Sequence, residues 1–190
     1  MCSLWAGTLC LCLPGTARPG PGQLARGCTR GAVLSELNFR EASAEDLPAV
    51  AKLWGKLDAF HRQLGLAFPE TEEAEQAWIN SIERTLGRFS FVWLAEQDET
   101  PQAFLMGRYK RLPETLGGVF VGEISDLYVD ESLRGKQVGA RLVELAVKKF
   151  KELDVHSVEV QILAGNEGAL EFWHKHGFED ELTQVRMVLE

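Results

Sequence analysis

The sequence predicts an α/β domain in which helices cover both faces of a mixed central sheet. Three patterns support this fold class. Short runs of alternating apolar and polar residues are typical of strands. Longer runs with a 3.6-residue apolar period, such as residues 137–153, are typical of amphipathic helices. Glycine and proline separate the two kinds of run. Taken in order, they predict β-α-α-β-β-β-α-β-α-β.

The first three elements follow from local signals. Residues 37–42 alternate as a strand does. Ser43 precedes Asp46 and Pro48, a pattern that starts helices, and Gly65 ends the resulting helix. A second helix is expected over residues 69–86.

The remaining elements follow the same logic. Aromatic and β-branched residues predict strands, and Gly177 ends the last helix. The expected strands are residues 89–96, 102–110, 119–129, 157–163 and 184–189, and the expected helices are residues 137–153 and 166–176.

Composition divides the chain into two parts. Residues 1–35 contain all four cysteines and no acidic residue, and a disordered extension is expected there, with a targeting segment as the alternative. Residues 36–190 form the predicted domain. They hold 17 Lys and Arg against 28 Asp and Glu, a net charge of −11 (17 − 28). This acidity argues against nucleic-acid binding and is compatible with a cationic substrate.

The predicted domain lacks the residues that several kinds of catalysis need. The predicted domain has no cysteine, so no thiolate nucleophile is expected, and its histidines do not show zinc-ligand spacing, so no metal is expected. No run approaches the roughly 20 apolar residues of a membrane span. A cytoplasmic protein without a membrane partner is the expectation.

The segment Arg134-Gly-Lys-Gln-Val-Gly139 joins a strand to a helix. A helix N-terminus has unpaired N–H groups and a positive dipole, so it binds anions. Arg134 and Lys136 add positive charge, and the glycines permit close approach. The alternative is a solvated basic turn that only starts a helix.

Two blocks together resemble the GNAT superfamily of N-acetyltransferases. The first is Leu127-Tyr-Val129 followed by residues 134–139, which resembles Arg or Gln, x, x, Gly, x, Gly or Ala. The second is Asn166-Glu-Gly-Ala169-Leu-Glu-Phe172-Trp173-His-Lys-His-Gly177-Phe178. The resemblance implies a single GNAT-type domain with acetyl-CoA as co-substrate.

The resemblance also implies a set of acetyl-CoA-binding residues. The main-chain N–H groups from Gln137 to Ala140 would hold the pyrophosphate. The backbone of Leu127 to Val129 would pair with the pantetheine arm, and the N–H near Tyr128 or Val129 would polarise the thioester carbonyl. The full set is Leu127, Tyr128, Val129, Arg134, Gly135, Lys136, Gln137, Val138, Gly139, Ala140, Asn166, Ala169 and Trp173.

Two positions depart from the superfamily pattern. Gln137 replaces a glycine, and we expect it to be tolerated because φ in the first turn of a helix is negative. Trp173 replaces a tyrosine that protonates the leaving thiolate in many relatives, and Trp cannot ionise. Tyr128 or Tyr109 is the expected substitute, and a thiolate also leaves tolerably without help.

A general base would help to deprotonate an alkyl ammonium before it attacks the thioester. In histone-type relatives, a glutamate at the offset of Glu123 has this role. Asp126 is the second candidate. By strand alternation the two lie on opposite faces unless a bulge intervenes. The alternative is that the carboxylate only pairs with a nearby Lys or Arg.

The function expected from these features is direct acetyl transfer from acetyl-CoA to a primary amine of a small molecule or peptide. A non-catalytic acyl-CoA-binding module is the alternative, because of Gln137 and Trp173. Pairing of edge strands is common in the superfamily, so a homodimer is one expected assembly.

Overall fold

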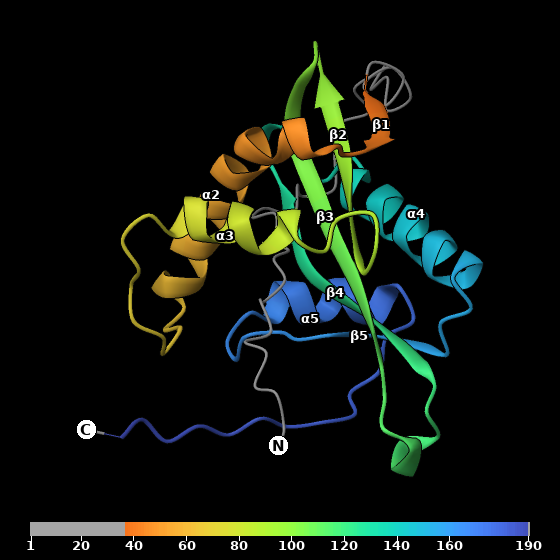
Figure 1. Cartoon of the computed structure of the whole chain (residues 1–190). Helices are drawn as coiled ribbons and strands as arrows, with labels where there is room; N and C mark the ends of the chain where they lie inside the picture. Colours follow the sequence, from red (N-terminus) through yellow and green to blue (C-terminus); the bar gives the residue numbers. More distant parts are fainter. Residues whose placement is uncertain (1–36, 190) are drawn as a thin grey trace, which may run out of the picture.

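The computed structural model describes residues 37–189, and the predicted extension at residues 1–35 lies outside them. A five-stranded sheet forms the centre of the domain (Figure 1). The strands are β1 (Asn38–Glu41), β2 (Ser90–Gln97), β3 (Thr100–Arg111), β4 (Phe120–Val129) and β5 (Ser157–Val160). The helices are α2 (Leu47–Gln63), α3 (Ala74–Glu83), α4 (Val138–Glu152) and α5 (Glu167–Lys175), with short 3₁₀ turns η1 (Ala44–Asp46), η2 (Glu114–Leu116) and η3 (Glu131–Leu133).

The sheet is mixed. Its spatial order is the chain order, β1-β2-β3-β4-β5. Neighbours from β1 to β4 are antiparallel, whereas β4 and β5 are parallel. Helix α4 makes the crossover that a parallel pair requires. The predicted mixed α/β class is therefore confirmed.

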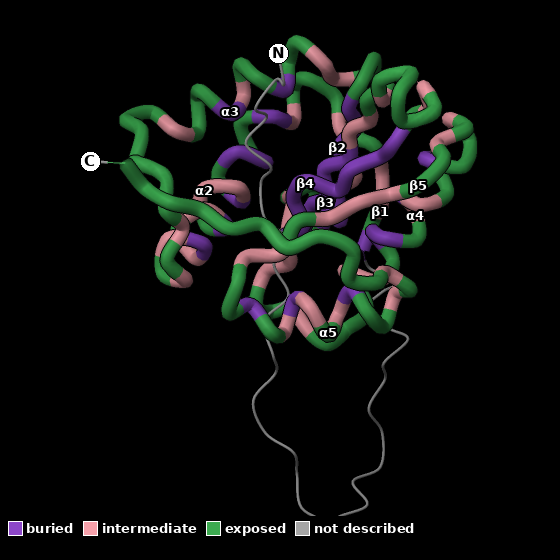
Figure 2. Tube along the Cα trace, turned by 90° about the horizontal axis from the view of Figure 1, so that it is seen from below, coloured by how far each residue is buried: buried purple, intermediate pink, exposed green. Residues whose placement is uncertain are grey.

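Each face of the sheet has its own hydrophobic core, and the strands between them are largely buried (Figure 2). Helices α2 and α3 pack on one face, against Val92, Leu94, Phe104 and Met106. Helices α4 and α5 pack on the other. We refer to these as the α2 face and the α4 face. Alternation along β2 and β3 divides their side chains between the two cores.

Two strand glycines make room for aromatic packing on the α4 face. A Cβ at Gly107 would lie 2.3 Å from the Phe91 ring, and a Cβ at Gly122 would lie 2.7 Å from the Phe150 ring. Those two rings meet edge to face, with centroids 5.1 Å apart. A side chain at either glycine would force the aromatic pair apart.

The predicted elements before residue 177 are confirmed, with shifted ends. The second helix begins at Ala74 rather than residue 69, and the fifth strand ends at Val160 rather than residue 163. None of the described helices is long and apolar enough to cross a membrane.

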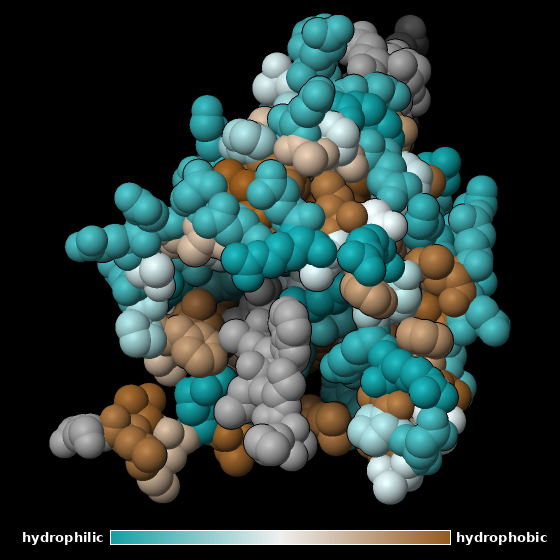
Figure 3. Space-filling view, viewed as in Figure 1, coloured by the Kyte–Doolittle hydropathy of each residue, from teal (hydrophilic) through white to brown (hydrophobic). Residues whose placement is uncertain are grey.

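The predicted last strand, residues 184–189, is wrong. The segment is extended but has no strand pairing, and its apolar side chains are exposed at the end of the chain (Figure 3). The alternating pattern is real, but a strand also needs a neighbour for its backbone groups. The described sheet ends at β5, and this segment does not join it.

Candidate active site

Strands β4 and β5 diverge partway along their length. Their pairing runs from Val121 opposite Ser157 to Ile124 opposite Val160 and stops there. Strand β4 continues to Val129 while it stays paired with β3. The last five residues of β4 therefore have an open edge on the side from which β5 has departed.

The open edge presents the backbone of Leu127 and Val129. The Asp130 N–H donates to the Gln102 carbonyl across from β4, at 2.9 Å. Because strand residues alternate in direction, Tyr128 also faces β3, whereas Leu127 and Val129 face away from it. The guanidinium of Arg134 donates from Nε to the Val129 carbonyl at 3.2 Å, which agrees with this orientation.

Gln137 adopts a left-handed backbone, with φ +65° and ψ +11°. We expected a negative φ, and this expectation is wrong because Gln137 is the N-cap that precedes the first helical residue, Val138. A positive φ costs an L-residue roughly 1–2 kcal/mol relative to glycine. The departure at Gln137 therefore bears on the backbone conformation as well as on close approach, because a glycine would adopt this φ without strain.

The first turn of α4 offers free main-chain donors. The Arg141 N–H is bonded back to the Gln137 carbonyl at 3.0 Å, so the N–H groups of residues 138–140 precede the helical ladder. Gln137 makes no side-chain cap to them. A cavity of ≈ 290 Å³ adjoins this turn and is lined by Phe39, Gln137, Ala140, Arg141 and Glu144. An anion fits this end of the helix.

A β-bulge in β4 brings Glu123 and Asp126 to the same face. Met106 is opposite Asp126, and the next residue of β3, Gly107, is opposite Ile124. Ser125 is therefore the extra residue of the bulge. Uninterrupted alternation predicted opposite faces for the two carboxylates. The bulge overturns that prediction and places both on the α2 face.

Glu123 is held by a cation from β3. Arg108 donates to its two oxygens, with Nη2–Oε1 at 2.8 Å and Nε–Oε2 at 3.1 Å. Glu123 itself is buried. A bidentate pair of this kind is a charge-assisted interaction that fixes the position of the side chain. Glu123 thus makes the ion pair that the alternative expects, and its role as a base stays a prediction.

The surroundings of Asp126 differ from those of Glu123. Its side chain is fully buried, and only Oδ2 has a described partner, the Ser125 hydroxyl at 2.6 Å. Burial raises the pKa of Asp126 to about 7. Smaller effects come from the Ser125 bond, the Arg108 charge and the Trp54 indole, which lower the pKa, and from Glu123, which raises it. A carboxyl group with a pKa near neutrality can exchange protons at physiological pH.

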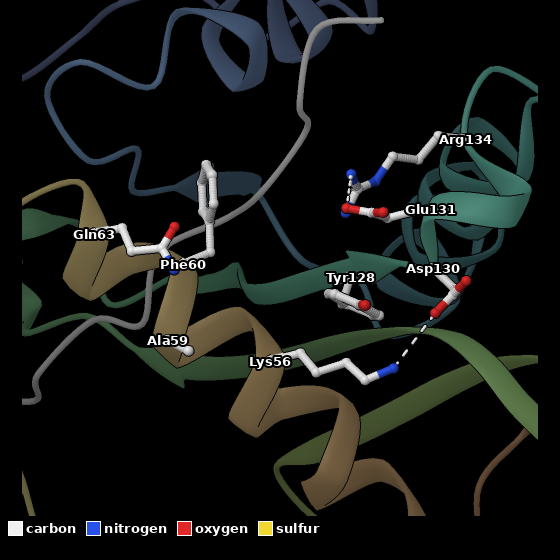
Figure 4. A pocket seen from close by; sticks show the side chains of 8 residues that line it. All are labelled: Lys56, Ala59, Phe60, Gln63, Tyr128, Asp130, Glu131 and Arg134. Carbon is white, nitrogen blue, oxygen red and sulfur yellow. Dashed lines mark hydrogen bonds and ion pairs between the residues drawn. The ribbon is translucent and has the colours of Figure 1, made fainter.

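A cavity of ≈ 420 Å³ lies between α2 and the end of β4 (Figure 4). Its lining residues are Lys56, Ala59, Phe60, Gln63, Tyr128, Asp130, Glu131 and Arg134. Lys56 reaches across it to Asp130 at 3.4 Å, and its ammonium lies 5.9 Å from the centre of the Tyr128 ring. Burial raises the pKa of Tyr128, so its hydroxyl stays protonated at neutral pH.

The second sequence block forms the start and the buried side of α5. The Asn166 side chain accepts the Ala169 N–H at 3.2 Å and so caps the helix. Ala169 and Trp173 are fully buried, and Trp173 packs between Phe172 and Phe178. In this structure these residues support the helix. Direct contact of Trp173 with acetyl-CoA would need a side-chain movement and stays a prediction.

Sequence reasoning missed three groups that the structure brings to the site. Arg108 holds Glu123, Trp54 lies near Asp126 and Lys56 spans the larger cavity. The sequence predicted the helix that carries Trp54 but not the proximity of its indole to Asp126 on β4. Tyr109, a predicted proton donor, instead donates its hydroxyl to the Arg88 carbonyl. No group of His, Cys, Asp and Glu within residues 37–189 could hold a metal ion.

The chain belongs to the acetyltransferase (GNAT) family. The family model matches residues 57–178, which is more than half of the 190 residues. The match includes all of β2 to β5, both carboxylates and the segment 134–139.

Two curated proteins are similar in sequence. YwnH of Bacillus subtilis (strain 168), provisionally named a phosphinothricin acetyltransferase, is 26% identical over 142 residues, which are 75% of this chain and 83% of YwnH. The uncharacterized N-acetyltransferase MJ1207 of Methanocaldococcus jannaschii is 34% identical over 61 residues. That match covers 32% of this chain and 27% of MJ1207, so the chain corresponds to about a quarter of that relative.

Two solved structures share the fold. A predicted acetyltransferase from Clostridium acetobutylicum, crystallised with acetyl-CoA, has a TM-score of 0.66 and 16% identity over 80% of this chain and 96% of its own. The aminoglycoside acetyltransferase meta-AAC0020, from an uncultured soil metagenomic sample and in complex with trehalose, has a TM-score of 0.62 and 17% identity. That similarity covers 82% of this chain and 98% of the meta-AAC0020 chain.

Proposed function

We propose that this protein transfers the acetyl group of acetyl-CoA directly to a primary amine. Family membership supports the reaction class. The observation that carries the proposal is the combination, on one strand, of an open backbone edge at Leu127 and Val129 with a buried carboxyl group at Asp126. The open edge can pair with an amide-rich chain, and the carboxyl group can act as the proton acceptor.

The chain's own groups fit acetyl-CoA. The free N–H groups of residues 138–140 would hold its pyrophosphate, with Arg134 and Lys136 adding positive charge. The Leu127 and Val129 backbone would pair with the pantetheine amides as an added strand does. Val129 rather than Tyr128 would direct its N–H to the thioester carbonyl, because the Tyr128 backbone faces β3. Asn166, Ala169 and Trp173 would support this cleft from α5.

Two side chains would move the protons. Asp126 would accept the proton that the substrate ammonium must lose before its nitrogen can attack. The nitrogen then forms a C–N bond with the thioester carbon and loses its second proton to solvent. The C–S bond breaks with its electron pair on sulfur, and Tyr128 donates its hydroxyl proton to the leaving thiolate. Proton transfer from Asp126 back to Tyr128 through solvent restores both groups. Glu123 acts through Arg108 and its charge on Asp126.

The acceptor is a primary amine of a small molecule or peptide. The similar fold of meta-AAC0020, an aminoglycoside acetyltransferase, supports the small-molecule case. The cavity beside Tyr128 is the proposed site for such an amine, and its two carboxylates, Asp130 and Glu131, are paired with Lys56 and Arg134.

The test is release of CoA from acetyl-CoA across a panel of amines that includes polyamines, aminoglycosides, amino acids and N-terminal peptides. We expect turnover with at least one acceptor, together with saturable CoA binding in a parallel titration. Saturable binding without CoA release on any amine would favour a non-catalytic binding module. Absence of CoA binding would contradict the proposal altogether.

A further inference from the structure

The cavity of ≈ 420 Å³ between α2 and the end of β4, which we call the acceptor cavity, has the volume of a small-molecule site. One face of α2 lines it with residues at helical spacing, which are Lys56, Ala59, Phe60 and Gln63. These four side chains carry one positive charge and no negative charge. The methyl group of Ala59 and the ring of Phe60 form an apolar wall beside that charge (Figure 4).

The residue that follows β4 supplies the opposite charge. By alternation Asp130 lies on the same side of the strand as Tyr128 and Asp126. Oδ1 of Asp130 accepts the Ser132 N–H at 3.2 Å and the Ser132 hydroxyl at 2.9 Å. Among the described residues, Oδ2 meets only the Lys56 ammonium, at 3.4 Å. The local turn therefore holds the carboxylate of Asp130 in place and leaves Oδ2 available to a second cation.

The acceptor cavity contains two ion pairs, and that of Lys56 with Asp130 is the one beside the Tyr128 ring, whose centre lies 5.9 Å from the ammonium. The other joins Arg134 to Glu131. The Lys56 side chain is 56% exposed, so its ammonium can take a second anionic partner. The two charges of an α-amino acid are attached to one carbon and are about as close together as those of Lys56 and Asp130. Placed antiparallel to this pair, each charge of the amino acid would meet its opposite.

Other primary amines complement the pair of Lys56 and Asp130 less well. A simple alkylamine offers Asp130 a cation and competes with Lys56 for it. A diamine also brings a second positive charge toward Lys56. The amide of an amino acid, or the N-terminus of a peptide, has the ammonium but only a neutral carbonyl where the carboxylate would be. Repulsion or a missing charge partner acts against each of these acceptors.

On the basis of the acetyl transfer proposed above, we propose that the acceptor is an α-amino acid with an apolar side chain, acetylated on its α-amino group. Asp130 binds the ammonium, Lys56 binds the carboxylate, and the apolar wall of α2 contacts the side chain. The ammonium is thereby held beside Tyr128, where the nitrogen loses its protons and attacks the thioester carbon in the reaction already described. The products are the N-acetylamino acid and CoA. Lys56 is then the residue that determines specificity for the acid.

The test compares kcat/KM for apolar α-amino acids from alanine to phenylalanine, each measured beside its own amide at saturating acetyl-CoA. The ratio of acid to amide should be roughly tenfold higher in wild type than in Lys56→Met, as expected for one charged hydrogen bond, and the difference should lie mainly in KM. Comparing ratios between proteins cancels the different amine pKa values of acid and amide. The ratio should fall further in Lys56→Glu. Lys52→Met, which removes an exposed charge from the same helix, is the control and should keep the wild-type ratio.

The outcomes separate this assignment from the reaction itself. Acetylation of amides or alkylamines with the same acid-to-amide ratio in wild type and Lys56→Met would overturn the amino acid assignment and leave acetyl transfer intact. No CoA release with any amine would contradict the transfer and the assignment together.

A second measurement needs no turnover. Calorimetric titration of the preferred amino acid into the CoA-bound protein should give a Kd roughly tenfold weaker in Lys56→Met than in wild type, and an unchanged Kd in Lys52→Met. Equal affinity of wild type and Lys56→Met would overturn the role of Lys56.

Discussion

The segment 134–139 and the bulged stretch 123–126 lie on either side of the open end of β4, and they contribute to the site in different ways. The first offers main-chain N–H groups, which almost any side chain leaves in place. The second offers two carboxylates whose states depend on burial and on one arginine. A site built from backbone is expected to tolerate substitution, including the one at Gln137, whereas a site built from side chains depends on identity and register.

The largest effect should come from Asp126→Asn. If Asp126 is the general base, its loss should lower kcat by about 10²–10⁴-fold, the usual value of such catalysis. CoA affinity should stay the same, since the carboxyl group is buried on the α2 face. Steady-state kinetics with the best amine of the panel, together with calorimetric CoA titration, measure both. A loss of affinity with little change in kcat would place Asp126 in binding instead.

The same variant should change how stability depends on pH. The folded pKa of Asp126, about 7, lies above the ordinary aspartate value of 3.8, so the folded state binds the extra proton. The stabilising contribution of this group is therefore fully present below about pH 4, and it is lost as the pH rises through about 7. Asp126→Asn removes a penalty of up to about 4 kcal/mol. Urea unfolding should show a stabilised variant at pH 8 and near-equal stability at pH 4, and equal stability at both would contradict the raised pKa.

Arg134→Ala should weaken CoA binding by roughly tenfold, as expected for one lost charged hydrogen bond. The arginine now bonds to the Val129 carbonyl and Glu131, and we expect it to turn to the pyrophosphate. At saturating acetyl-CoA, kcat should be unchanged. Lys148→Ala, which removes a charge from an exposed position on the following helix α4, is the control and should leave the Kd unaltered.

Gln137→Gly should produce the smallest effect. Glycine adopts the observed φ of +65° without strain, so stability should rise by about 1 kcal/mol. For a domain of this size that is roughly 2–4 °C in Tm. CoA affinity should be preserved or improved because the N–H groups remain. A large loss of affinity would show that the Gln137 side chain is itself a ligand, and Gln137→Ala would then show the same loss.

The contrast between the backbone-built segment 134–139 and the side-chain-built stretch 123–126 also explains what the sequence could predict. Amphipathic periods located the helices, and the two sequence blocks located the helix N-terminus and the open strand end. The bulge at Ser125 could not be read from alternation, because its signal is the pairing of Met106 and Gly107 with another strand. The pairing of Arg108 with Glu123 depends on that same register. The alternation of residues 184–189 predicted a strand that the structure does not form, because whether a neighbour is present is not a local property.

The pH dependence of kcat in wild type and in Glu123→Gln tests the central claim most directly. The wild-type rate should rise with pH through an inflection near 7, where Asp126 becomes a carboxylate. In Glu123→Gln the inflection should persist and move to lower pH, because the Glu123 charge raises the pKa of Asp126. If instead Glu123→Gln abolishes both the inflection and the rate while Asp126→Asn retains them, Glu123 is the base and the assignment to Asp126 is wrong.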